Sequence, residues 1–182
     1  MKSLEIVGDS YVGSYDRVRR ACRGIIVQDG KILLSHGAAK GLWMIPGGGL
    51  EEGEDERECC IREVAEETGY RIEPEACVLE TVEYFRSLKH INHYFTAKVV
   101  GQAAQHLTEV EQKMDMAPCW VPIPDAIETF SHFGPELEMS DLRRSLYQRE
   151  YAVLRELFEN NGKLKMENEG ETDSRGRVAA SE

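Results

Sequence analysis

The sequence lacks the long apolar run that a membrane span requires. No stretch approaches the roughly 20 consecutive apolar residues of a transmembrane helix, and residues 1–5 do not open the apolar core of a secretory signal. We therefore expect a protein of the cytoplasm that has no membrane as a partner.

The sequence also lacks the closely spaced cysteine pairs that are typical of zinc sites. The five cysteines are Cys22, Cys59, Cys60, Cys77 and Cys119. Their number is odd and none of them belongs to a C-x-x-C motif, so they fit neither a disulfide framework nor a zinc site. We expect reduced thiols.

Basic residues are the scarcer charged class. The chain of 182 residues has 22 lysines and arginines against 33 aspartates and glutamates, which gives a formal net charge of −11. Nucleic acids and anionic membranes attract basic surfaces, so this charge argues against either as the main partner. The length and the 41% hydrophobic composition fit one globular domain.

Apolar runs between turn residues predict the strands. Residues 24–27 and 31–34 flank Asp29-Gly30, a dipeptide typical of a hairpin. A glycine-rich loop is expected at residues 46–49. Further strands are expected over residues 4–7, 77–85, 91–100 and 120–121, with a turn at residues 87–89.

The clearest helix signals surround residues 55–68. Asp55 with Glu58 three positions later resembles a capping box, and Gly69 is placed as a stop signal. These signals predict one helix between a glycine-rich loop and the next strand.

Two later segments have helix-start signals, and a polar tail follows them. Pro124 suits the first position of a short helix, and Ser140 suits the cap of a longer one over residues 140–160. The apolar stripe of the longer helix, which should pack on the core, consists of Leu142, Leu146, Val153 and Leu157.

Residues 163–182 are polar and without periodicity, which predicts a disordered tail after a domain of residues 1–162. This mixed order of elements predicts an α/β sandwich, a sheet with helices on both sides.

The helix over residues 55–68 carries several carboxylates on one face. Glu63, Glu66 and Glu67 are neighbours there because residues three and four positions apart share a helix face. Like charges at this spacing destabilise a helix by about 0.2–0.5 kcal/mol per pair, and a divalent cation between them would remove that cost. A solvated acidic face is the alternative for the glutamates alone. The opposite side, which should pack on the sheet while the carboxylates face outward, consists of Ile61, Val64, Ala65 and Thr68.

These glutamates stand at a fixed offset from a glycine triplet. Gly48 is followed after five residues by Glu54, and after seven more by the run Arg62-Glu63-Val64-Ala65-Glu66-Glu67-Thr68-Gly69-Tyr70. The stretch resembles the Nudix box, the signature of the Nudix hydrolase family, and the resemblance extends over about residues 20–130. The seven characteristic positions are filled by Gly48, Glu54, Arg62, Glu63, Glu66, Glu67 and Gly69. A chance match at seven positions is on the order of 10⁻⁸ at about 7% usage per residue.

The resemblance implies a Nudix-like α/β/α sandwich with a mixed sheet, a C-terminal helix and a metal site for Mg²⁺ or Mn²⁺. The implied ligands are the Gly47 backbone carbonyl, Glu63, Glu66 and Glu67. Glu54 and Arg62 would pair to hold the loop against the helix. The base that takes a proton from the attacking water is left open among Glu63, Glu109 and Glu111. The sequence departs from the family at Tyr70, where an aliphatic residue is usual, and at Ser35-His36, where many members carry an arginine.

The implied activity is metal-dependent hydrolysis of a diphosphate bond in a nucleoside diphosphate linked to another moiety. The alternative is a Nudix-fold protein that senses a nucleotide without turnover, which would be expected to have a broken box. The substrate is left open among a nucleoside triphosphate, a nucleotide sugar and ADP-ribose, and a homodimer is left open too. The candidate substrate contacts are Arg23, His36, Lys40, Tyr84 and Arg86, and the candidate aromatic surfaces for a base are Trp43, Tyr84 and Phe85.

Overall fold

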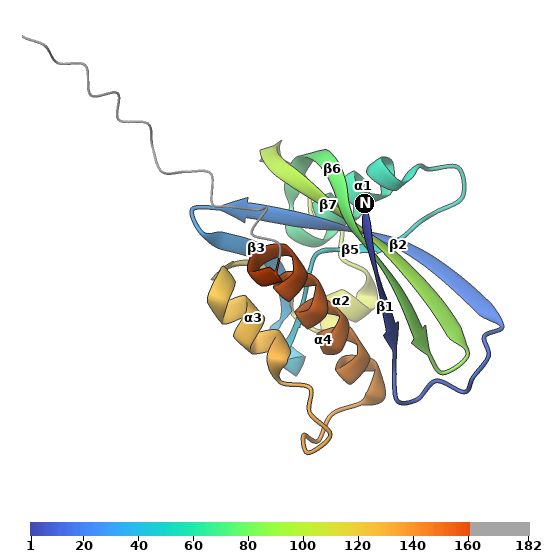
Figure 1. The fold of residues 1–182 in the computed structure, drawn as a ribbon. Helices are drawn as coiled ribbons and strands as arrows, with labels where there is room; N and C mark the ends of the chain where they lie inside the picture. The colour runs from blue at the N-terminus through green and yellow to red at the C-terminus, as the bar shows by residue number, and fades with distance from the viewer. Residues whose placement is uncertain (161–182) are drawn as a thin grey trace, which may run out of the picture.

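The computed structural model describes residues 1–160 (Figure 1). The strands are β1 (Lys2–Val7), β2 (Arg17–Gln28), β3 (Lys31–Gly37), β4 (Leu42–Met44), β5 (Gly47–Gly49), β6 (Tyr70–Phe85), β7 (Leu88–Gln102) and β8 (Met116–Pro122). The helices are α1 (Glu56–Thr68), α2 (Glu109–Lys113), α3 (Ile123–Ser131) and α4 (Asp141–Leu154), with a 3₁₀ turn at Ala38–Lys40 and a π turn at Arg155–Asn160. The predicted tail at residues 163–182 lies outside the described part.

A mixed sheet forms the centre of the fold. Its strand order is β1-β6-β7-β2-β3-β4, with β5 paired to β2 and β8 paired to β3. β1 runs parallel to β6 and β2 runs parallel to β7, whereas the other pairs are antiparallel. The long β2 therefore joins the two halves of the sheet, because its partners are β7, β5 and β3.

Helices cover both faces of this sheet. α1 packs on one face, and the pair α3 and α4 packs on the other (Figure 1). Alternating residues of the strands supply the two cores: Ile26 and Leu33 lie in the cluster with Val64 of α1, while their neighbours belong to the cluster with Phe130 and Leu154. This arrangement confirms the predicted sandwich and its C-terminal helix.

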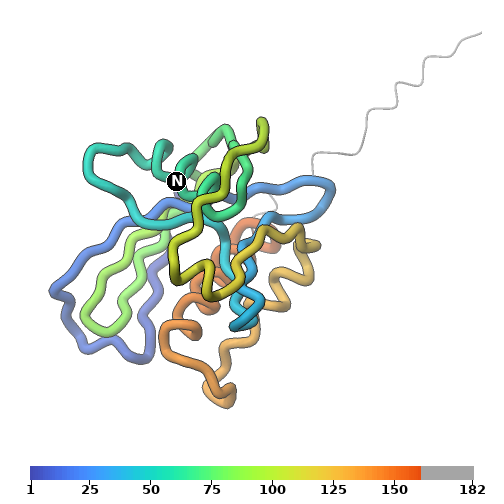
Figure 2. The backbone as a smooth tube through the Cα atoms, turned by 180° about the vertical axis from the view of Figure 1, so that it is seen from behind, coloured from blue at the N-terminus to red at the C-terminus, as the bar shows by residue number. Residues whose placement is uncertain are grey.

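Backbone hydrogen bonds join the connection between β1 and β2 to the tip of the β6–β7 hairpin. Figure 2 shows the connection between β1 and β2 beside the tip of the β6–β7 hairpin. Val12 donates a backbone hydrogen bond to Arg86 at 3.2 Å, and Asp16 donates one to Ser87 at 3.0 Å. These contacts fix the first strands against the hairpin.

The hairpin predicted at Asp29-Gly30 is confirmed. β2 and β3 are antiparallel with Gln28 opposite Lys31, and the two turn residues have φ values of 50° and 71°. Asparagine, aspartate and glycine adopt such positive φ values more readily than other residues, which is why this turn was readable.

The second hairpin is longer than predicted, and its turn lies earlier. β6 starts at Tyr70, directly after α1, and Leu88 already pairs with Phe85, so the turn residues are Arg86 and Ser87. The register shifts between Arg71 and Leu79 interrupt the alternation of buried and exposed residues. The prediction missed the first half of β6 because such irregularities hide the period of two.

The predicted loop at residues 46–49 contains a short strand instead. β5 pairs with β2, with Cys22 opposite Gly48. Gly47 has a φ of 141°, and a Cβ atom there would lie 2.1 Å from the carbonyl oxygen of Cys22. The glycines therefore allow an approach between backbones that a side chain would block.

α1 begins and ends where the signals placed it. The side chain of Asp55 accepts hydrogen bonds from the backbone of the first turn, Glu58 completes the capping box, and Gly69 adopts the left-handed conformation. The packing side was predicted wrongly for Ile61, which is 36% exposed. The buried face is rotated toward Cys59, Cys60, Val64, Glu67 and Thr68.

α4 has the predicted cap but only part of the predicted stripe. The hydroxyl of Ser140 accepts a hydrogen bond from the backbone of Arg143 at 3.3 Å. Val153 is fully buried, whereas Leu142 is 67% exposed. Leu142 lies in the first turn of α4, where it borders a cavity rather than the core, so its assignment to the core was wrong. Within residues 1–160, no helix is long and apolar enough to cross a membrane.

Candidate functional site

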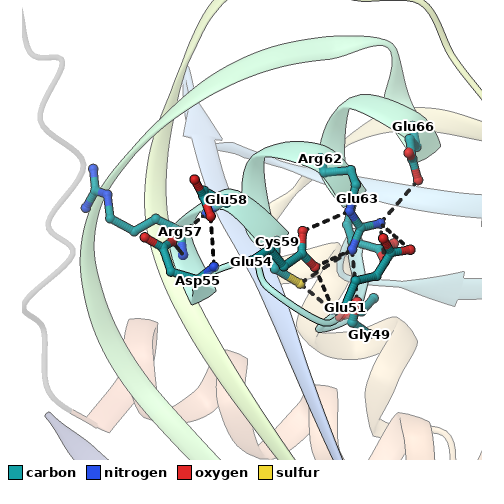
Figure 3. A network of polar contacts seen from close by, with 11 residues as sticks. Gly49, Glu51, Glu54, Asp55, Arg57, Glu58, Cys59, Arg62, Glu63 and Glu66 are labelled. Carbon is teal, nitrogen blue, oxygen red and sulfur yellow. Dashed lines mark hydrogen bonds and ion pairs between the residues drawn. The ribbon is translucent and has the colours of Figure 1, made fainter.

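Arg62 is the centre of a polar network between the glycine triplet and α1 (Figure 3). It donates two hydrogen bonds to Glu54, at 2.6 and 3.0 Å, and one to the carbonyl of Gly49 at 3.0 Å. Its other terminal nitrogen donates to Glu63 at 2.9 Å and to Glu66 at 3.4 Å. The hydrogen bonds from Arg62 lower the pKa of Glu54 to about 2.

Glu67 lies inside the protein, on the face of α1 that contacts the sheet. Its carboxylate accepts hydrogen bonds from the hydroxyl of Ser35 at 2.9 Å and from the backbone nitrogen of Gly47 at 3.2 Å. Only 5% of the residue is exposed, and burial raises its pKa to about 8. The expectation that all three carboxylates face outward was therefore wrong for Glu67.

Glu63 occupies the space that the missing side chain of Gly48 leaves. A Cβ atom on Gly48 would lie 2.2 Å from a carboxylate oxygen of Glu63. Burial raises the pKa of Glu63, while its contacts with Arg62 act in the opposite direction. Gly48, the second glycine of the triplet, thus leaves room for the carboxylate of Glu63.

The proposed metal ligands are near one another without forming a closed cluster. Glu63 and Glu67 line the same cavity together with Gly47. Arg62 contacts both Glu63 and Glu66, and among residues 1–160 no three carboxylate, histidine or cysteine side chains form a metal-binding group. The donors are hard oxygens, the chemistry that Mg²⁺ and Mn²⁺ prefer. The chemistry of these donors therefore fits such a cation, although Glu63 and Glu66 are ion-paired with Arg62 in this structure.

Arg23, a predicted substrate contact, is almost fully buried and already has partners. It donates to Asn92 at 3.1 Å and to the carbonyls of Ile45 at 2.9 Å and Gly47 at 3.3 Å. A carboxylate oxygen of Glu150 lies 3.9 Å away. Arg23 therefore links α4 to the chain on both sides of Pro46.

The prediction missed a buried group of charges between α4 and the sheet. Arg149 contacts Glu83 at 3.1 Å and Glu150 at 2.8 Å, and the hydroxyl of Tyr94 donates to Glu150 at 3.2 Å. Ser145 donates a hydrogen bond to Glu83. One signal was available, since Arg149 falls within the apolar stripe of its helix, and a charged residue there needs a buried partner.

A cavity of about 770 Å³ extends from the glycine triplet to the start of α4. Glu63 and Glu67 lie at its glycine-rich end. Five basic residues also line it: Arg19, Arg23, Lys40, Arg143 and Arg149. An apolar wall completes it and consists of Leu42, Met44, Phe85, Leu88, Val110, Met114, Met139, Leu142 and Leu146. The cavity therefore combines a charged part with an apolar part.

The two candidate bases in the 107–111 segment differ in position. Glu111 lines the cavity and accepts a hydrogen bond from the backbone of Thr108 at 2.7 Å. Glu109 does not line it, and its side chain is 91% exposed. Of this pair, the structure brings only Glu111 to the site.

Of the five predicted substrate contacts, all of which lie within residues 1–160, only Arg23 and Lys40 line this cavity. His36 stacks on Trp43 with ring centres 3.8 Å apart, and Tyr84 packs against Tyr11 at 5.2 Å. Arg86 lies 3.4 Å from Asp141. The structure therefore places His36, Tyr84 and Arg86 outside the cavity.

Comparison with known proteins identifies the class to which this fold and site belong. The model of the NUDIX domain family matches residues 18–140, and the chain belongs to this family. The structure of a NUDIX hydrolase from Nitrosomonas europaea superposes with a TM-score of 0.54 at 22% identity, covering 74% of this chain and 88% of that one. That likeness supports the fold.

The curated relatives share shorter stretches. An RNA pyrophosphohydrolase of Dinoroseobacter shibae is 34% identical over 71 residues, which is 37% of this chain and 44% of the relative. A Bacillus subtilis protein provisionally named as an ADP-ribose pyrophosphatase is 33% identical over 75 residues, covering 40% of this chain and 36% of the relative. The chain thus spans less than half the length of these relatives.

Proposed function

We propose that this protein hydrolyses a diphosphate bond in a nucleoside diphosphate linked to another moiety, with Mg²⁺ or Mn²⁺ as the cofactor. The observation that carries this proposal is the position of Glu63 and Glu67 beside the glycine triplet in one cavity. The names of two relatives, which give RNA and ADP-ribose as substrates, support the same bond class.

The proposed ligands are the carbonyl of Gly47 and the carboxylates of Glu63, Glu66 and Glu67. Burial raises the pKa of Glu67, and a cation bound beside it would favour its charged form. When bound, the cation would neutralise phosphate oxygens and activate water. Arg62 would then retain its hydrogen bonds to Glu54 and to the carbonyl of Gly49. Its hydrogen bonds to Glu63 and Glu66 would be replaced by the bonds of these carboxylates to the cation.

The chain's own groups would position the water and the substrate. Glu63 and Glu111 remain the candidates to accept the proton of the attacking water, since both line the cavity. The apolar wall, which includes Phe85 and Leu142, would contact the part of the substrate that carries no phosphate. A cavity with a charged part and an apolar part fits a substrate that has a charged diphosphate and a less polar moiety.

The alternative of a nucleotide sensor without turnover is less well supported, because the box is intact and two of its carboxylates reach the cavity. A panel of nucleoside triphosphates, nucleotide sugars and ADP-ribose, assayed with Mg²⁺ or Mn²⁺, separates the two. Turnover of none of these compounds would favour the sensor.

Glu67→Gln is the decisive variant. Its fold should be kept, because the buried group has a raised pKa and glutamine retains an oxygen that can accept from Ser35. Turnover should fall by at least about 100-fold, as is common when an electrostatic group of a site is removed. Glu52→Gln, on an exposed position before α1, is the control and should keep wild-type activity. Near-normal turnover of Glu67→Gln would contradict the metal assignment.

A further inference from the structure

Arg19 is a cation of the cavity that makes no hydrogen bond or ion pair within residues 1–160. It lies near the start of β2 and lines the cavity. Arg19 is exposed, whereas the buried or half-buried arginines of this region, Arg23, Arg62 and Arg149, all have carboxylate or carbonyl partners. In contrast, Arg19 makes no hydrogen bond or ion pair with the described chain.

The guanidinium of Arg19 lies directly beside the glycine triplet. Ala21, two residues further along β2, pairs with Gly49. A Cβ atom on Gly49 would lie 3.5 Å from one terminal nitrogen of Arg19 and 3.7 Å from its Nε. Because Gly49 has no side chain, the donors of Arg19 are not covered at the end of the cavity that holds Glu63.

The charges around Arg19 make an anionic ligand favourable. Partial burial and the neighbouring cations Arg23 and Arg149 lower its pKa. Those two cations form ion pairs with the buried carboxylates of Glu83 and Glu150. Arg19 forms none, although the charge of Glu63 acts on it from a greater distance and opposes the lowering of its pKa. A third guanidinium close to two others is repelled by them, and an anion in the cavity would offset that repulsion.

The alternation of β2 distinguishes Arg19 from the arginines next to it. Residues 19, 21 and 23 point to one face of the strand, and Arg20 points to the other. Arg20 is exposed and does not line the cavity. Arg17, near the strand's start, lies 3.8 Å from Asp16. Arg20 is therefore a matched control of the same type, strand and charge.

We propose that Arg19 binds a phosphoryl oxygen of the substrate's diphosphate group at the glycine-rich end of the cavity. The inference rests on the proposed function and adds to it a residue that the box does not contain. The planar guanidinium can donate two parallel hydrogen bonds to a phosphate, which a lysine ammonium cannot reproduce.

The test is equilibrium binding of imidodiphosphate, a diphosphate analogue whose bridging nitrogen resists hydrolysis. Titration calorimetry with the full chain, in Mg²⁺ and separately in EDTA, would compare wild type with Arg19→Met, Arg19→Lys and Arg20→Met. We expect Arg19→Met to weaken binding about 10–100-fold, as for the loss of charge-assisted hydrogen bonds. Arg19→Lys should be intermediate, and Arg20→Met should bind within about twofold of wild type. The melting temperature of Arg19→Met should stay near that of wild type, since the side chain makes no hydrogen bond or ion pair within residues 1–160.

Three outcomes would overturn the assignment. They are undiminished binding by Arg19→Met, an equal loss in the Arg19→Met and Arg20→Met variants, and no detectable binding by the wild type. Failure of the proposed function has a different signature: imidodiphosphate binds and the binding depends on Arg19, yet no diphosphate in the substrate panel is hydrolysed. If Arg19→Met does not fold, Arg19→Lys carries the same comparison.

Discussion

At the scale of single residues, Arg62 ties the loop before α1 to the helix. One side chain holds Glu54 through two hydrogen bonds and the carbonyl of Gly49 through a third (Figure 3). Hydrogen bonds to charged groups are the stronger ones in proteins, and the fork shape of a guanidinium fixes their direction. The pair therefore stabilises the shape of residues 49–54 beside the proposed metal ligands.

Glu54→Gln should destabilise the protein at neutral pH by on the order of 1 kcal/mol, since a charged acceptor is lost. The pKa of Glu54 is lowered from 4.5 to about 2, so its contribution is complete above about pH 4.5 and is lost as the pH falls toward 2. The difference between the variant and the wild type should therefore shrink over that range. Urea unfolding at pH 7 and at pH 3.5 measures it, and a constant difference would contradict the lowered pKa.

The residue scale also shows why the burial of Glu67 could not be predicted. The spacing of Glu63, Glu66 and Glu67 revealed a shared face, but not which way that face turns. The prediction that the three carboxylates face outward rested on the free-energy cost of burying a charge. Ser35 and Gly47, both distant in sequence, supply the hydrogen bonds that allow the burial of Glu67. Such partners become visible only when strands and helix are assembled.

At the scale of elements, α4 contacts the site through buried ions. Glu150 on α4 lies between Arg149 and Arg23, and Arg23 donates to the carbonyls of Ile45 and Gly47. The helix thus stabilises the segment that carries a proposed metal ligand. The connection makes the position of this segment depend on the packing of α4.

Glu150→Gln should be strongly destabilising. The substitution leaves two buried guanidiniums without one carboxylate, and breaking a buried pair costs about 3–5 kcal/mol. In a chain of this size that loss corresponds to a fall of about 10 °C in the melting temperature. Glu159→Gln is the control, because Glu159 also pairs with an arginine, Arg155 at 2.6 Å, but at the surface. Exposed ion pairs contribute little to stability, so similar melting temperatures for both variants would contradict the role of Glu150.

Local chemistry decided which elements were predictable. The Asp29-Gly30 turn, the Asp55 cap and the Ser140 cap depend on neighbouring residues, and the structure confirms all three. β5 and the exposure of Leu142 depend instead on distant partners: β2 pairs with the glycine triplet, and a cavity lies beside the first turn of α4. Sequence periodicity contains no information on either contact.

At the scale of the whole molecule, the net charge of −11 is unevenly distributed. Nine acidic residues lie between positions 51 and 67. Two of these acids, Glu63 and Glu67, line the cavity, whose basic residues are Arg19, Arg23, Lys40, Arg143 and Arg149. A divalent ion at the carboxylates would make this end of the cavity attractive to a diphosphate, which an acidic protein otherwise repels.

This charge distribution predicts that Mg²⁺ stabilises the whole domain. A ligand that binds the native state alone adds about 2.7 kcal/mol at 100 times its dissociation constant, which is about 5–10 °C in melting temperature for this size. The wild type should show that rise in millimolar MgCl₂ relative to NaCl of equal ionic strength, and EDTA should reverse it. Glu67→Gln should show little rise, and Glu52→Gln the full rise. An equal rise in Glu67→Gln would place the ion at other carboxylates, because general screening of the net charge is already matched by the NaCl reference.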